Sequence, residues 1–122
     1  MNVQEFSEVR VFISQEALIR LKKDKFVKEN RRTYNAEIFM ITNATLSRPT
    51  ETIGTFRISP RGSKKIRVAW HFSIQKGAIF VYIDDLLYHE SNDRYVDNWA
   101  QKVQTGRINA KSYGQFVPWI PF

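Results

Sequence analysis

Residues 65–83 read KIRVAWHFSIQKGAIFVYI and contain two apolar runs joined by a short turn. The first run, residues 65–74, alternates β-branched and aromatic side chains with polar ones, which is typical of a β-strand. The three residues that follow end at Gly77, and glycine readily adopts the positive φ angle that tight hairpin turns need. The second run, residues 78–83, is the most apolar strand candidate and is predicted to be central. The stretch therefore indicates an antiparallel hairpin.

The chain before this hairpin predicts a strand, a helix and two further strands. Residues 9–13 (VRVFI) alternate as a short strand does. Ser14 is a favourable N-cap, and the apolar residues after it have helical spacing. We therefore expect a helix with one apolar and one basic face over about residues 15–30. Residues 36–42 (AEIFMIT) are interpreted as a buried strand, and residues 50–59 as an alternating one.

The chain after the hairpin is predicted to continue or end the second strand in residues 84–88 and to hold a short helix within residues 91–103. The tail, residues 104–122, is basic and then aromatic, and it is expected to dock on the domain. A length of 122 residues fits a single domain, 1–122. The predicted fold is α+β, with the N-terminal strand and helix packed on a twisted, mainly antiparallel sheet of four to six strands.

The composition favours a polyanionic partner. Lysine and arginine total 19 against 12 acidic residues, which gives a formal net charge of +7, and aromatic residues make up 14% of the chain. Such a charge attracts nucleic acid, and aromatic rings can stack on bases. The same positive charge would also attract a membrane surface or an acidic protein. A charge excess that serves only solubility is the alternative without a partner.

Several function classes lack their sequence signals. The chain has no cysteine, which excludes disulfides, thiolate metal sites and cysteine nucleophiles. It has no phosphate-cradling GxxxxGK[ST] loop, GxGxxG, HExxH or GxSxG motif. The two histidines with Asp84 or Asp85 resemble no closed zinc site, so we expect no metal and no cofactor. The N-terminus lacks a signal peptide and no apolar run is long enough for a bilayer, so we expect a cytoplasmic protein without membrane contact.

A polar segment after the apolar strand holds the candidate catalytic residues. Loops that follow strand ends often carry functional sites. Cleavage of RNA by its own 2′-hydroxyl needs a base, an acid and a cation for the phosphate. His89 is the natural acid or base near neutral pH, Glu90 is an alternative base, and Tyr88 or Tyr95 is suited to stacking or to steering a proton. The candidate phosphate-binding cations are Arg61, Lys65, Arg67 and Arg94.

Structural roles compete with each of these assignments. A histidine such as His89 is commonly a hydrogen-bonded structural residue, and His71 lies within a strand between two aromatic residues. Asp84 and Asp85 can equally cap a helix start.

Three basic clusters together indicate a surface for RNA, although the first alone is typical of a solvated helix face. The first cluster is Lys22, Lys23, Lys25, Lys28, Arg31 and Arg32. The second is Arg57, Arg61, Lys64, Lys65 and Arg67. The third is Lys102, Arg107 and Lys111.

The order of elements resembles that of the RelE/ParE-type toxin superfamily. The resemblance covers about residues 9–99 and rests on a strand (VRVFI), a helix (SQEALIRLKK), a basic strand (KIRVAWHFSI), a glycine hairpin, an apolar strand (AIFVYI) and a polar segment (YHESNDRYVDNW). Glu90 stands where the family often has arginine. The strand pair expected over residues 36–60 stands where most members have a second helix, and the tail beyond Trp99 is longer than usual.

The resemblance implies that Arg67 matches the family's strand arginine, His89 its common histidine and Tyr95 the tyrosine that follows, with Lys64 or Lys65 as the loop lysine. Many members are mRNA endonucleases that act in the ribosomal A site, others block gyrase, and a partner antitoxin usually neutralises them. A RelE-like, metal-independent mRNA endonuclease with an acidic antitoxin is thus the implied function. The residues themselves leave two alternatives: a non-catalytic RNA- or ribosome-binding protein, and an interaction or inhibitor module with an acidic partner.

Overall fold

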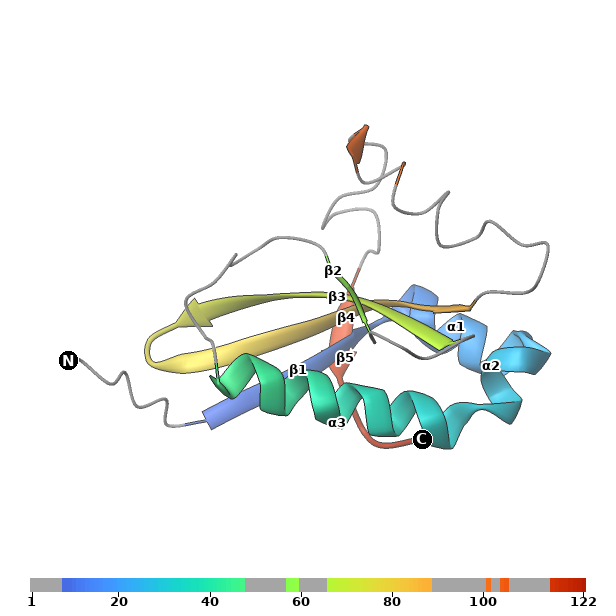
Figure 1. Ribbon diagram of the computed structural model, residues 1–122, viewed down its shortest axis with the longest axis horizontal. Helices are drawn as coiled ribbons and strands as arrows, with labels where there is room; N and C mark the ends of the chain where they lie inside the picture. Colours follow the sequence, from blue (N-terminus) through green and yellow to red (C-terminus); the bar gives the residue numbers. More distant parts are fainter. Residues whose placement is uncertain (1–7, 48–56, 60–65, 89–100, 102–103, 106–114) are drawn as a thin grey trace.

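The computed structural model describes residues 8–47, 57–59, 66–88, 101, 104–105 and 115–122 (Figure 1). Side chains of residues 44–47 and 57–59 are outside this description. The elements in chain order are β1 (Glu8–Ser14), α1 (Gln15–Lys23), α2 (Lys25–Glu29), α3 (Arg31–Ser47), β2 (Arg57–Ser59), β3 (Ile66–Gln75), β4 (Ala78–Tyr88) and β5 (Phe116–Pro118).

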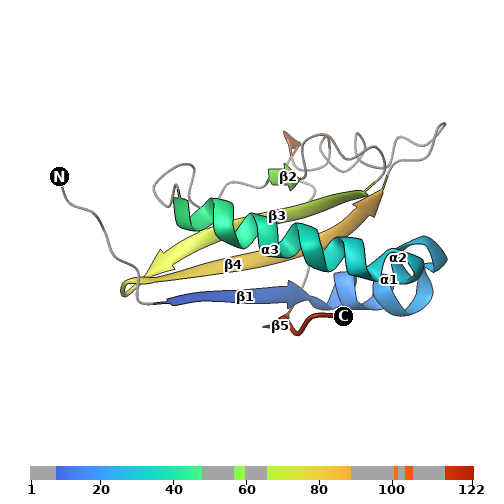
Figure 2. The ribbon, with the colours of Figure 1, turned by 60° about the horizontal axis from the view of Figure 1, so that its bottom comes forward.

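The strands form one mixed sheet in the order β2-β3-β4-β1-β5. β1 runs parallel to β4, and the other three pairings are antiparallel. Helix α3 lies along one face of the sheet, as Figures 1 and 2 show, and it contacts β1, β3 and β4. The predicted α+β class, the mainly antiparallel sheet of four to six strands and the central position of β4 are confirmed.

The β3–β4 hairpin has the predicted turn. Lys76 and Gly77 both have positive φ angles, 49° and 77°, as the central residues of a type I′ hairpin turn require. The pairing is regular from the turn to Trp70, which faces Ile83. It then shifts by one residue, because Ala69 faces Asp85 and leaves Asp84 as the extra residue of a β-bulge.

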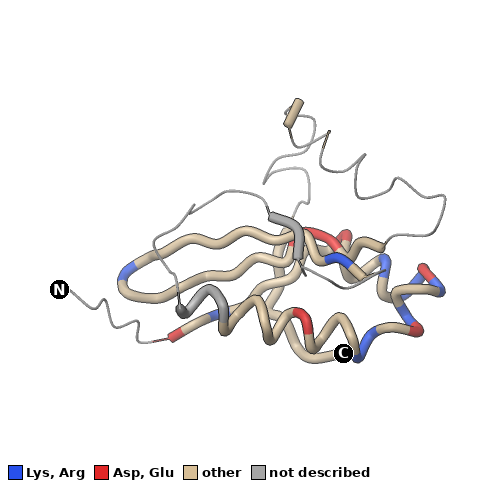
Figure 3. The backbone as a smooth tube through the Cα atoms, viewed as in Figure 1, with Lys and Arg blue, Asp and Glu red and all other residues tan. Residues whose placement is uncertain are grey.

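The helix expected over about residues 15–30 is two helices, so the prediction of one continuous helix is wrong. Ser14 caps α1 as predicted, with its hydroxyl oxygen accepting a hydrogen bond from the Ala17 amide. Asp24 then adopts an extended conformation, and its carboxylate accepts hydrogen bonds from the first amides of α2. A short acidic side chain that bonds to nearby backbone competes with helix continuation, which explains the break. In Figure 3, basic residues concentrate around α1 and α2.

Residues 36–42, predicted to be a buried strand, lie instead within helix α3. The buried residues Tyr34, Ile38 and Ile41 recur every three or four positions, which is the helical period. The short apolar run IFMI masked this period, because four consecutive apolar residues fit a strand or a helix equally well. Of the predicted strand over residues 50–59, the described residues 57–59 form β2, and the rest lies outside the described residues.

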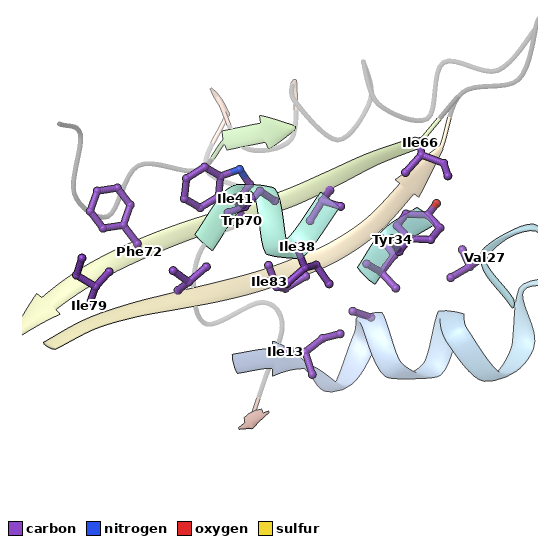
Figure 4. Packing of buried hydrophobic residues seen from close by; sticks show 14 residues of the cluster. Ile13, Val27, Tyr34, Ile38, Ile41, Ile66, Trp70, Phe72, Ile79 and Ile83 are labelled. Atoms are coloured by element: carbon purple, nitrogen blue, oxygen red, sulfur yellow. The ribbon is translucent and has the colours of Figure 1, made fainter. Parts of the chain in front are cut away.

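The hydrophobic core fills the space between α3 and the sheet (Figure 4). Tyr34 crosses this core and donates a hydrogen bond of 2.7 Å from its hydroxyl to the backbone oxygen of Leu87. The C-terminal residues run from the β1 edge of the sheet to α3. β5 pairs with β1, and the backbone of Phe122 exchanges two hydrogen bonds with the side chain of Asn35. These contacts join α3 to the end of β4 and to the C-terminal residues, which matters for the site.

Candidate nucleic-acid interface

The structure places three of the predicted site residues with their side chains, namely Lys22, Lys23 and Arg67. Arg57 is placed by its backbone in β2. The remaining candidates lie outside the described residues: Arg61, Lys64, Lys65, His89, Glu90, Arg94 and Tyr95. Of the third basic cluster, none of Lys102, Arg107 and Lys111 is described.

The first basic cluster gathers at one end of the molecule. It spans the last turn of α1, all of α2 and the first turn of α3, and its six side chains are exposed. One of these cations, Lys25, forms an ion pair with Glu29, with 3.9 Å between Nζ and Oε1. The pair is exposed and four residues apart on α2, so it contributes little stability. Lys76, in the hairpin turn, lies at the opposite end of the sheet (Figure 3). We call this group the helical cation cluster: Lys22, Lys23, Lys25, Lys28, Arg31 and Arg32.

A hollow of about 510 Å³ lies within the helical cation cluster. Its walls combine the apolar side chains of Leu21 and Phe122 with the cations Lys22, Lys28 and Arg31. Phe122 reaches this position because of its hydrogen bonds to Asn35, described above. The hollow therefore offers both apolar surface and positive charge to a ligand.

The end of β4 lies against the junction of α1 and α2. The hydroxyl of Tyr88, the last residue of β4, donates a hydrogen bond of 3.0 Å to Oδ2 of Asp24. Its ring packs on Phe26 of α2 with a centroid distance of 4.5 Å. His89 follows Tyr88 directly in the sequence. The predicted catalytic segment thus begins beside the helical cation cluster.

Arg67 lies at the same end of the sheet. In the β3–β4 ladder it faces Leu87, next to the pair formed by Ile66 and Tyr88. Its side chain is half-buried, and Nη1 donates a hydrogen bond of 2.9 Å to the backbone oxygen of Ile66. Burial raises the pKa of Glu37 on α3, and the positive charge of Arg67 opposes that shift. The register therefore brings Arg67 close to the point where the segment that contains His89 starts.

A buried histidine–aspartate pair lies on the sheet face opposite α3. His71 Nδ1 and Asp84 Oδ2 are 2.8 Å apart, and the carboxyl group of Asp84 is fully buried. The His71 ring stacks on Tyr82 at 4.9 Å and meets the edge of Phe116 from β5. Burial raises the pKa of Asp84 to about 6, although the hydrogen bond and charge of His71 act in the opposite direction. These contacts support the structural role considered for His71.

The neighbouring Asp85 has its own buried partner. Its Oδ1 lies 2.8 Å from Nε of Arg20 on α1 and also accepts a hydrogen bond from the Leu86 amide. Burial raises the pKa of Asp85 to about 6 against the attraction of Arg20. The suggestion that Asp84 and Asp85 cap a helix start is wrong, because both lie inside β4. Within the described residues, no three His, Asp or Glu side chains gather as a metal site would require.

Sequence reasoning missed both buried pairs. The strand pattern places Asp84 and Asp85 at the end of an apolar run, but only the bulge determines which partners they meet. Comparison of the sequence with known protein families and with curated proteins finds no match. None of the described helices combines the length and apolar character that crossing a bilayer requires.

Proposed function

We propose that this protein binds RNA, alone or on the ribosome, through the helical cation cluster. The observation that carries the proposal is the concentration of six exposed cations on α1, α2 and the first turn of α3, beside the end of β4. Contacts of this kind neutralise phosphates and release counterions, so they supply affinity without requiring a particular base sequence.

The finer proposal is a RelE-like, metal-independent mRNA endonuclease. It is supported by the register that sets Arg67 near the end of β4, where His89 follows in the sequence. It is also supported by α3, since most members of that superfamily have a second helix where a strand pair was expected here. In this proposal the cluster binds the RNA backbone, Arg67 binds the scissile phosphate, and His89, Glu90 and Tyr95 move protons or stack.

Salt-dependent RNA binding tests the role of the cluster. A double variant, Lys22→Gln with Lys23→Gln, removes two exposed cations from the last turn of α1. For single-stranded RNA, the slope of log affinity against log salt should fall by ~1.4 if both lysines contact phosphate, at about 0.7 for each contact. Lys76→Asn is the control, because it removes one cation at the far end and asparagine tolerates the positive φ there. An equal loss for each cation removed in the two variants would refute the proposed interface.

Cleavage is tested separately with ribosomes and mRNA. Under the endonuclease proposal, His89→Ala and Arg67→Gln lower the cleavage rate by orders of magnitude while circular dichroism and melting remain close to wild type. If the wild-type protein binds RNA but does not cleave it, the endonuclease proposal is refuted and the protein is a non-catalytic RNA-binding protein.

An acidic protein partner is the second candidate, and the hollow favours it. Leu21 and Phe122 offer apolar surface among Lys22, Lys28 and Arg31, which suits a peptide that carries an apolar side chain between carboxylates. This candidate predicts weak RNA binding at physiological salt and recovery of an acidic protein in a pull-down. Leu21→Ala should weaken that complex more than it weakens RNA binding.

A further inference from the structure

Two adjoining hollows lie in the helical cation cluster. The first, described above, has Leu21 and Phe122 among its walls. The second has a volume of about 490 Å³, and its described lining residues are all charged: Lys28, Glu29, Arg31 and Arg32. Lys28 and Arg31 line both hollows, so these two cations form the boundary between a space with apolar walls and a polar one.

The apolar walls of the first hollow are in place before a ligand binds. Leu21 and Phe122 are half-buried, because each also packs against the hydrophobic core. The backbone of Phe122 exchanges hydrogen bonds of 2.9 and 3.0 Å with the side chain of Asn35 on α3. A wall that is already ordered spares a ligand the entropic cost of ordering it. The first hollow is therefore largely preformed.

The side chains of the first hollow suit an unpaired nucleobase. Bases that lie outside a duplex stack on aromatic rings and on the flat guanidinium group of arginine, and the hollow contains one of each in Phe122 and Arg31. Its volume of about 510 Å³ falls within the ~300–1,000 Å³ of small-ligand pockets, so a base with its ribose has room there. A paired base is stacked inside its duplex and cannot enter.

The second hollow suits the phosphate next to such a base. Three of its four described lining residues are cations, and Glu29, the fourth, is the partner of Lys25 in the ion pair described above. The space is therefore net positive, and arginine can bind phosphate through two parallel hydrogen bonds. A strand with one base in the first hollow carries its adjoining phosphate past Lys28 and Arg31. The alternation of flat rings and anions along RNA thus matches the two hollows.

We propose, as an extension that rests on the proposed function, that the first hollow binds one unpaired base of single-stranded RNA and the second hollow binds the adjoining phosphate. Phe122 and Arg31 contact the base, whereas Lys28 and Arg32 contact phosphate. Stacking tolerates every base, because each has a π-face. The site therefore selects unpaired strands and does not select a sequence.

Two labelled oligomers of equal charge test the base site by fluorescence anisotropy at low salt. Each has about nine ribose-phosphate units; one carries a single central adenine, and the other is entirely abasic. The wild-type protein should bind the adenine oligomer at least ~5-fold more tightly with the same salt slope, because stacking adds affinity without releasing counterions. Equal affinities would overturn the base site while RNA binding stands. Binding of neither oligomer, nor of RNA with all its bases, would refute the proposed function as well.

Variants at position 122 test the aromatic wall. Phe122→Leu keeps an apolar side chain but removes the ring, so it should bind both oligomers about equally, whereas Phe122→Tyr should keep the preference for adenine. Ile120→Ala is the control, because Ile120 is 77% exposed and is not among the described residues that line the hollow. A full preference in Phe122→Leu, with melting close to wild type, would overturn the proposal.

An acidic peptide tests the competing occupant of the first hollow. The probe carries a single phenylalanine between glutamates and has the same net charge as the oligomers. The adenine oligomer should bind more tightly than this peptide, because only the oligomer also places a phosphate at Arg31 and Arg32. Tighter binding of the peptide would overturn the base site in favour of an acidic protein partner.

Discussion

The substitution Asp84→Asn should change how stability depends on pH. Asp84 is the extra residue of the β4 bulge, and its carboxyl group is fully buried beside His71. Asparagine has nearly the same shape, and its side-chain oxygen still accepts a hydrogen bond from His71 Nδ1. The variant therefore removes the titration of the group and keeps most of the packing.

The magnitude follows from the raised pKa. Burial raises the pKa of Asp84 from 3.8 to about 6, so the folded protein holds this proton more tightly than the unfolded chain does. Stability from this group is therefore fully present below about pH 3.8 and is lost as the pH rises through about 6. The difference between 3.8 and about 6 corresponds to ~3 kcal/mol of stability, at ~1.36 kcal/mol for each pH unit.

The assay is urea unfolding of both proteins at several pH values from about 7.5 to about 4. Asp85, whose pKa is also raised to about 6, titrates in both proteins and cancels in the difference. Acidification from about pH 7.5 to about pH 4 should thus stabilise the wild type relative to Asp84→Asn by ~2 kcal/mol, since the full effect is reached only below about pH 3.8. Two curves that stay parallel over this range would show that the burial of Asp84 does not control its ionisation.

Three further substitutions test other parts of the fold and site. Arg20→Met leaves the buried Asp85 carboxylate without its ion pair, so urea unfolding at neutral pH should show a loss of ~3–5 kcal/mol. Gly77→Ala should lower the free energy of unfolding by ~1 kcal/mol, because alanine is strained at the positive φ of this position. Steric contact adds nothing to this cost, since an added Cβ meets no atom within 4 Å. Tyr88→Phe removes the hydrogen bond to Asp24, and it should destabilise the protein by ~1 kcal/mol and weaken RNA binding with an unchanged salt slope.

The sequence predicted those parts of the fold that local signals determine. The β3–β4 hairpin follows from two alternating runs and a glycine, and Ser14 marks the boundary between β1 and α1 as a good cap should. The α+β fold class and the central position of β4 follow from these local signals, since a hairpin of this length needs a helix to cover one of its faces. In these regions, propensity, periodicity and turn chemistry all favour the same structure.

The failures occur where local signals are ambiguous or where the partner is distant in the sequence. Residues 36–42 carry both strand and helix signals, and only packing against the sheet selects the helix. The pairing of Asp85 with Arg20 joins positions far apart in the chain, so no local pattern encodes it. Only part of the candidate site could be predicted from the sequence. The basic residues of the helical cation cluster form a charge run that the sequence shows directly, but their position beside Tyr88 depends on the fold.

That position depends on Asp24. A continuous helix over residues 15–29 would extend ~22 Å and carry Lys25 and Lys28 away from the sheet. Instead, Oδ1 of Asp24 caps α2, and Oδ2 accepts the hydrogen bond from Tyr88 at the end of β4. The break turns the chain back, so that Lys28 and the start of α3 line the same hollow as Leu21. One carboxylate thus converts a basic helix face, common in soluble proteins, into a compact group of cations at the end of the sheet where the predicted catalytic segment begins.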